Sequence, residues 1–161
     1  MDPRIAPLAE MLRMNTRLYR NCLAGLTDDK ARVRPTATTN NAAFVAAHLV
    51  DSRYYLLSSL GVKQSSPLKG AKGGFNKIDD VTAFPPLAES QAAWTSAGEA
   101  LGKRLGAITA AELDAPLDPG FPLETKSLLG VLVFLVQHEG YHLGQLGLLR
   151  KYAGLAGMAY D

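Results

Sequence analysis

The chain reads TKSLLGVLVFLVQHEGYHLGQLGLLRKY from Thr125 to Tyr152, and this segment has the residue spacing of one long helix. Residues three or four positions apart lie on the same side of an α-helix. One such face consists of Leu128, Val131, Leu135, His138, His142, Gln145 and Leu149. The apolar run at its start covers only residues 128–136, whereas a membrane-spanning helix needs about 20 apolar residues. The segment therefore predicts a helix buried within a folded domain.

Three further segments of the 161-residue chain have helical spacing, and no segment shows the alternating pattern of a strand. They cover about residues 3–26, 41–60 and 87–105, and the pattern from Thr109 to Glu112 predicts one short additional helix. Each long segment is apolar on one side and needs partners to bury that side. We therefore expect an all-α fold, a four-helix bundle formed by residues 1–161 as a single domain.

The expected helix ends follow from capping and turn residues. Asp2 suits the start of the first helix, and Thr39 or Asn40 suits the start of the second. Glycines are expected to end the second, third and fourth helices, at Gly61, Gly106 and Gly154. A long crossover, residues 61–86, joins the second and third helices and is rich in Gly, Ser and Lys. A crossover of this length is either a lid or binding loop, or a mobile surface connection.

The composition excludes several functional classes. The chain is 47% hydrophobic and 20% charged, which excludes a disordered or collagen-like protein. A net charge of +2 is too small for an electrostatic nucleic-acid surface, so we expect no nucleic-acid partner, and the short apolar runs predict no membrane partner. The one cysteine, Cys22, excludes a disulfide framework and is compatible with a reducing cytosol. No export signal is apparent, and we expect a cytoplasmic protein.

The three histidines of the chain, His48, His138 and His142, all fall in predicted helices. His138 and His142 are four residues apart and point the same way from one helix, which suits binding of one metal ion. Imidazoles in an apolar face cost desolvation energy unless they are paired or ligated. Three of them converging in a bundle would form a three-nitrogen metal site with an open coordination position. The residues alone leave a second interpretation open, a non-catalytic bundle whose histidines bind metal weakly or only pack.

Residues 138–142, HEGYH, also satisfy the HExxH pattern of zinc metalloproteases, in which Glu139 would be the general base. The extended pattern requires a glycine and a histidine where this chain has Gln145 and Leu148. The only acidic residue farther along the chain is the terminal Asp161. No strand is predicted beside this helix, so a metalloprotease is the weaker alternative.

Two segments resemble the histidine signatures of the DinB-like superfamily. Residues 39–55, TNNAAFVAAHLVDSRYY, are similar to its first histidine segment. Residues 136–146, VQHEGYHLGQL, are similar to its second, in which HxxxH is followed by Gly-Gln-Leu. The two segments appear in the family's order, about 90 residues apart. The resemblance extends over nearly the whole chain.

This resemblance implies a four-helix bundle that holds a divalent metal through three histidines and commonly forms a homodimer. By position the ligands are His48, His138 and His142, and the metals of the family are zinc, nickel or iron. The resemblance also implies a metal-dependent hydrolase or a thiol S-transferase, with a low-molecular-weight thiol as cofactor and a small molecule as substrate. One open metal position fits both reactions, since a metal lowers the pKa of a water or a thiol.

Two acidic residues near the histidines are candidates to orient a ligand imidazole. Asp51 follows His48 by three residues, and Glu139 is adjacent to His138. Glu139 lies about 100° from His138 around the helix, so a solvated position or a contact with another subunit is equally open. For both residues, packing is the alternative role.

Other side chains are candidates for the walls of a pocket. Gln145 is expected to reach the pocket, and Tyr55 or Tyr141 to line it. Cys22 is expected to be a buried structural thiol rather than a nucleophile. For these residues, too, packing or capping is the alternative role.

Overall fold

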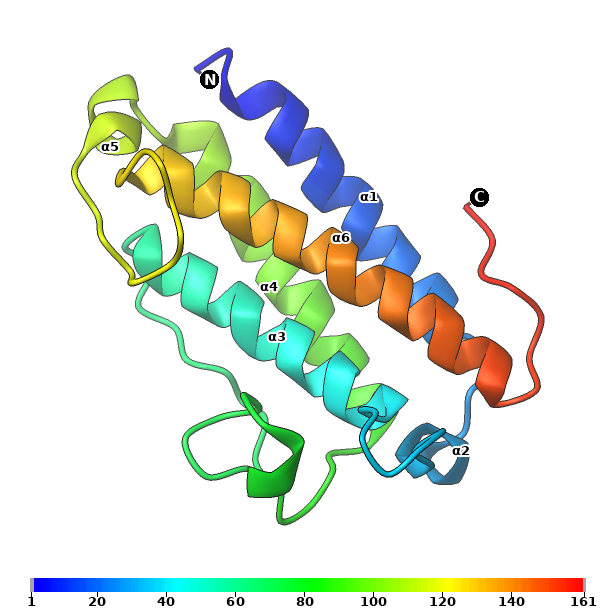
Figure 1. Cartoon of the computed structure of the whole chain (residues 1–161). Helices are drawn as coiled ribbons and strands as arrows, with labels where there is room; N and C mark the ends of the chain where they lie inside the picture. Colours follow the sequence, from blue (N-terminus) through cyan, green and yellow to red (C-terminus); the bar gives the residue numbers. More distant parts are fainter. Residues whose placement is uncertain (1, 161) are drawn as a thin grey trace.

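The computed structural model describes residues 2–160, and it confirms the expected all-α bundle (Figure 1). The four long helices are α1 (Ile5–Leu23), α3 (Ala42–Ser59), α4 (Leu87–Ala107) and α6 (Leu128–Tyr152). The connections contain two short helices, α2 (Asp28–Arg32) and α5 (Ala110–Asp114), and one 3-10 turn, η1 (Ile78–Asp80). Within the described residues, β structure is limited to two isolated bridges. None of the helices described is long and apolar enough to span a membrane.

Side-chain caps fix where several helices begin. The side chains of Asn41 and Ser127 accept backbone N–H groups at the starts of α3 and α6. Both helices begin within three residues of the predicted position. The capping box predicted for α5 is confirmed, because Thr109 accepts the Glu112 N–H and the Glu112 carboxylate accepts the Thr109 N–H. The five-residue α2, which Thr27 caps, was too short to show a periodic pattern in the sequence.

Two of the predicted helix ends are wrong. Asp2 does not cap α1, which begins only after Arg4. The Asp2 carboxylate instead accepts the backbone N–H of Arg4 at 2.9 Å and a hydrogen bond from the Arg4 guanidinium. Gly106 does not end α4, which continues one residue further. Gly61 and Gly154 follow helix ends as expected, with left-handed φ values of +79° and +81°.

The long helices pack around one core in the order α1, α6, α3 and α4, and α4 in turn contacts α1 (Figure 1). The rings of Tyr19 and Trp94 stack in this core with their centroids 4.4 Å apart. The first part of α3, residues 42–47, is buried on all its faces. Its alanines leave room for the neighbouring segments to approach closely, and His48 follows directly at the edge of the core.

The crossover between α3 and α4 folds onto α3 instead of projecting into solvent (Figure 1). The Gly70 carbonyl accepts the N–H groups of Thr82 (2.7 Å) and Ala83 (3.0 Å), which closes a segment that we call the Gly70–Ala83 loop. Gly70 has a φ of +118°, and a Cβ there would lie 1.9 Å from the Ala83 oxygen, so this closure requires glycine. Phe75, within the loop, is 1% exposed and joins the core.

One ion pair is buried in the core between α3 and α6. Arg53 Nε donates to Glu139 Oε1 at 2.7 Å, and the two side chains are 0% and 2% exposed. Arg53 also donates to the Leu12 carbonyl and the Thr16 hydroxyl, and its guanidinium carbon lies 3.3 Å from the ring centroid of Trp94. Of the roles left open for Glu139, the structure supports packing over orienting a histidine or facing solvent, because Arg53 holds its carboxylate in the core.

Candidate metal centre

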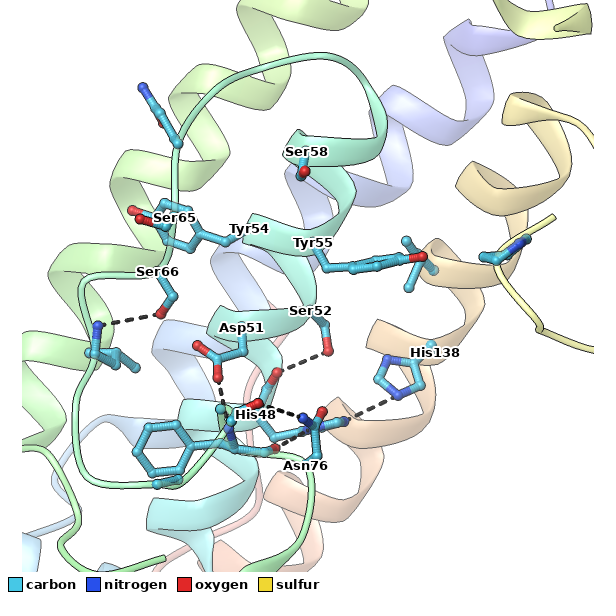
Figure 2. Close-up of a pocket in the computed structure, with 18 of the residues that line it drawn as sticks. His48, Asp51, Ser52, Tyr54, Tyr55, Ser58, Ser65, Ser66, Asn76 and His138 are labelled. Atoms are coloured by element: carbon cyan, nitrogen blue, oxygen red, sulfur yellow. Dashed lines mark hydrogen bonds between the residues drawn. The ribbon is translucent and has the colours of Figure 1, made fainter. Parts of the chain in front are cut away.

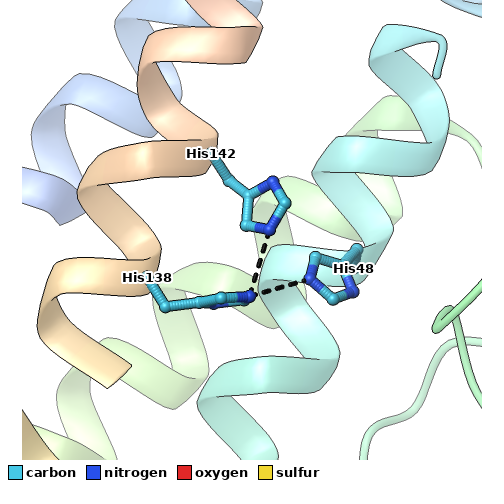
Figure 3. A group of neighbouring side chains, drawn as sticks. All are labelled: His48, His138 and His142. Carbon is cyan, nitrogen blue, oxygen red and sulfur yellow. Dashed lines mark hydrogen bonds between the residues drawn. The ribbon is translucent and has the colours of Figure 1, made fainter. Parts of the chain in front are cut away.

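The structure brings the three histidines together between α3 and α6 (Figure 3). His48 comes from α3, whereas His138 and His142 lie one turn apart on α6. The Nε2 atom of His138 lies 3.2 Å from Nε2 of His48 and 3.0 Å from Nε2 of His142. One nitrogen from each ring lies within 4.8 Å of the other two. These three rings form a group that could hold a metal ion.

The spacing of these nitrogens suits a metal ion. Zinc–nitrogen bonds of about 2.0–2.1 Å in tetrahedral geometry place two ligand nitrogens about 3.3 Å apart. The two Nε2 separations, 3.0 and 3.2 Å, are close to that value. Three protein ligands leave at least one position open on a four-coordinate ion, as in catalytic sites. The donor set and its spacing therefore fit a divalent metal.

The second ring nitrogen is held by an acceptor in two of the three histidines. His48 Nδ1 lies 2.7 Å from the carbonyl oxygen of Phe75, and His142 Nδ1 lies 2.7 Å from Gln145 Oε1. Because both partners are oxygen acceptors, each Nδ1 carries the proton and donates it. The lone pair is then on Nε2, which faces the other histidines. His138 Nδ1 is buried and has no hydrogen-bond partner among the described residues.

Burial keeps the three imidazoles in their neutral form. It lowers the pKa of His138 to about 4, with further contributions from the neighbouring His142 and His48 rings. Burial is also the largest cause of the lowered pKa values of His48 and His142. A neutral imidazole is the form that binds a metal. At neutral pH the site is therefore ready to accept a cation without first losing protons.

A pocket of about 910 Å³ opens beside His48 and His138 (Figure 2). The Gly70–Ala83 loop forms one wall of it, and α3 forms another. The α3 wall carries the hydroxyls of Ser52 and Ser58. Figure 2 shows Ser52 near His48 and His138, and Ser58 farther along α3. His142 does not line this pocket, so a ligand would approach the candidate metal position from the side of His48 and His138.

The third wall of the pocket is aromatic. Phe121 stacks on Phe134 with ring centroids 4.5 Å apart, and Phe134 stacks on His138 at 6.2 Å. Tyr55, as expected, lines the pocket and tilts against Phe121 at 5.8 Å. Tyr141 does not line it and meets the edge of the His142 ring instead. A ligand next to His138 would therefore have a flat apolar surface on one side.

Asp51 and Gln145 support the histidines in ways that the sequence indicated only in part. Asp51 Oδ2 accepts the backbone N–H of Phe75 at 2.8 Å, so its hydrogen-bond link to His48 runs through the loop. Gln145 does not line the pocket as expected, because its Oε1 accepts from His142. The Phe75 carbonyl is a partner that the sequence did not reveal, since any residue offers a backbone carbonyl.

The position of Glu139 argues against the metalloprotease alternative. Its Oε1 accepts from Arg53 Nε, and its Oε2 accepts from Arg53 Nη2 and Asn15 Nδ2, both at 3.1 Å. Both oxygens are thus bound on the core side of α6 and are not available as a base at the histidines. The HExxH string here follows from the spacing of two candidate ligands and of one partner of a core ion pair on the same helix.

Cys22 takes no part in this site. Its side chain is buried, and Sγ contacts the Leu143 carbonyl oxygen and the sulfur of Met158. Burial raises the pKa of the thiol to about 11. The expected structural role fits these contacts, because a thiol with so high a pKa is a weak nucleophile.

Comparison with known proteins points to one family. A sequence model described as the DinB superfamily matches residues 11–146. A crystal structure of a conserved protein from Enterococcus faecalis aligns with a TM-score of 0.75 over 92% of this chain and 96% of that chain, at 13% sequence identity. At this identity the likeness is one of fold alone. No curated protein matches the chain in sequence.

Proposed function

The chain belongs to the DinB superfamily, and we propose that it binds one divalent metal ion through His48, His138 and His142 and uses it in catalysis. The observation that carries the proposal is the convergence of three Nε2 atoms beside a pocket that His48 and His138 line. In two of the rings the opposite nitrogen is bound to an acceptor. Such outer partners are typical of metal-ligating histidines, because they fix the tautomer and raise the basicity of the ligand.

The reaction that we propose is thiol S-transfer or hydrolysis on a small-molecule substrate. When bound, a divalent metal supplies a Lewis acid that makes a coordinated thiol or water more acidic. The chain supplies the rest: a stack of Phe121 and Phe134 against which an apolar group can lie, and serine hydroxyls that can hold polar groups. The site needs no protein nucleophile, in agreement with the buried Cys22. Zinc, nickel and iron all fit three imidazole ligands.

An activity screen of the metal-loaded protein tests this proposal. The thiol arm combines glutathione with an electrophilic arene, and the hydrolysis arm uses an activated ester. We expect turnover in one arm that a chelator abolishes and that His138→Ala lacks. Ser59→Ala is the matched control, since Ser59 lies on α3 but does not line the pocket. Bound metal without turnover in either arm would favour the alternative, a non-catalytic metal-binding bundle.

We also propose that the protein is a cytoplasmic homodimer. One face of α6 carries exposed apolar side chains at Val133, Tyr141 and Leu148, which a second subunit would cover. Analytical ultracentrifugation should give twice the chain mass of 17.2 kDa, and Leu148→Arg should give the mass of one chain. A monomeric wild type would contradict the dimer, and cell fractionation tests the location.

A further inference from the structure

A chain of two hydrogen bonds links Asp51 to the candidate ligand His48 through one residue of the Gly70–Ala83 loop (Figure 2). Asp51 Oδ2 accepts the Phe75 N–H at 2.8 Å, and the Phe75 carbonyl accepts from His48 Nδ1 at 2.7 Å. Asp51 and His48 lie one turn apart on α3, so the peptide groups on both sides of Phe75 bridge two side chains of the same helix face. The loop therefore contributes to the metal centre without contributing a ligand.

These two bonds are also the attachment of the loop. Among the described residues they are the hydrogen bonds that join the Gly70–Ala83 loop to α3. The loop is closed on itself at Gly70, and its apolar anchor is Phe75, which is 1% exposed. Loop docking and the orientation of His48 thus depend on the same atoms.

Gly74 shows how closely the loop approaches Asp51. Its φ is +92°, and a Cβ at this position would lie 3.0 Å from Asp51 Oδ2. A side chain would strain the backbone and push against the carboxylate that holds the Phe75 N–H. Gly74→Ala is therefore a way to loosen the loop without replacing a titratable residue.

We propose that Asp51 and Phe75 are positioning residues that couple docking of the Gly70–Ala83 loop to metal binding by His48. When the loop is docked, the proton of His48 is held on Nδ1 and the Nε2 lone pair is free for the metal. When the loop leaves, His48 loses its acceptor, and the tautomer with the proton on Nε2, which cannot bind there, becomes accessible. The coupling is reciprocal: if docking of the loop favours metal binding, then metal binding must stabilise the docked loop.

This coupling gives the loop a role in substrate binding. Gly73, Gly74, Phe75 and Asn76 line the pocket beside His48. Docking of the loop therefore completes a pocket wall and orients a metal ligand in one step. The inference rests on the proposed metal binding, and loss of the metal would shift the loop towards its undocked form.

The test compares Asp51→Ala with Gln145→Ala, which removes the equivalent acceptor from His142 but leaves the loop alone. Zinc affinity is measured by competition with a chelator, and amide hydrogen exchange of residues 70–83 is measured with and without zinc. Loss of an outer partner costs roughly 10–100-fold in metal affinity, and we expect such a loss in both variants. In wild type and Gln145→Ala, saturating zinc should slow exchange in the loop. In Asp51→Ala the loop should exchange faster without zinc and gain less protection with it.

Two further variants guard against a general loss of structure. Asp51→Asn keeps an oxygen acceptor for the Phe75 N–H and should retain zinc affinity within a few-fold, while Gly74→Ala should repeat the behaviour of Asp51→Ala. The ¹⁵N chemical shifts of His48 in the metal-free protein report its tautomer, which should change in Asp51→Ala and stay as in wild type in Gln145→Ala.

Different outcomes would overturn different claims. Unchanged zinc affinity and an unchanged His48 tautomer in Asp51→Ala, or loop exchange in wild type that zinc does not alter, would overturn the coupling alone. Equal loosening of the loop by Gln145→Ala would do the same. A wild-type protein that binds no zinc would overturn the proposed function together with the coupling.

Discussion

Among the three histidines of the site, His138 has the pKa that is lowered most. Burial and the two neighbouring rings lower it to about 4. The pKa values of His48 and His142 are lowered as well. An unfolded chain takes up protons on its histidines as the pH falls below about 6.5, whereas the folded metal-free chain does not until lower pH. Because the unfolded state then binds more protons, the free energy of unfolding decreases as the pH falls from 6.5 towards 4.

Urea unfolding of the metal-free protein across this pH range measures the effect. His138→Asn cannot be protonated in this range, so its free energy of unfolding should decline less steeply than that of wild type. The carboxylates of the chain are the same in both proteins and cancel in the comparison. If the free energy of unfolding declined equally with pH in the two proteins, the lowered pKa of His138 would be contradicted.

Cys22 should react slowly with alkylating agents. It is 1% exposed, and burial raises the pKa of its thiol to about 11, so the reactive thiolate is scarce at pH 8. Mass spectrometry after iodoacetamide treatment should show little modification of the native protein and full modification in denaturant. Since the chain has only this cysteine, the denatured protein is its own control. Modification of the native protein at the denatured rate would show that the thiol is accessible.

Two of the three histidines were predictable from their own helix, and His48 followed from the family resemblance. The i, i+4 pair His138 and His142 could be recognised because helical spacing places both rings on one side. The buried position of Glu139 could not be predicted, because a charged residue on an apolar helix usually faces water. Its buried position depends on Arg53, which is 86 residues away in the sequence.

At the scale of helices, removing one partner of the Arg53–Glu139 ion pair between α3 and α6 should be strongly destabilising. Removing one partner leaves the other charge buried without compensation, which costs about 3–5 kcal/mol. Arg53→Met should therefore lower the free energy of unfolding by about 3–5 kcal/mol. The double variant Arg53→Met, Glu139→Leu should recover most of the lost stability, because neither charge is left buried. Chemical denaturation of both variants measures the change.

The exposed pair of Lys126 and Asp118 provides the control for this prediction. These side chains are 60% and 51% exposed, and an ion pair of this kind contributes about 0–1 kcal/mol. Lys126→Met should thus change the free energy of unfolding very little. Equal effects of Arg53→Met and Lys126→Met would contradict the importance of the buried pair.

The long helices lie within three residues of their predicted ends, because each has enough turns for its apolar spacing to be recognised. The short elements were not predictable in the same way. α2 has five residues and η1 has three, which is too few for a periodic pattern. The docking of the Gly70–Ala83 loop depends on Phe75 and Asp51, whose contact joins residues 24 positions apart in sequence.

At the scale of the whole molecule, the fold depends on the pattern of apolar residues more than on their identities. The Enterococcus faecalis protein has the same fold over 92% of this chain with only 13% of its residues identical. The site needs more than this pattern. Its three rings meet because α3 and α6 are neighbours in the bundle, and its pocket exists because the crossover folds back onto α3.

The most direct measurement is the metal content of the untagged protein by elemental analysis, beside His48→Ala and the control Ser58→Ala. His48 is the candidate ligand that decides the test, because among the three histidines it alone comes from α3. The three-histidine site predicts about one equivalent of metal in wild type and in Ser58→Ala, and little in His48→Ala. No metal in wild type after incubation with zinc or nickel, or equal metal in His48→Ala, would contradict it.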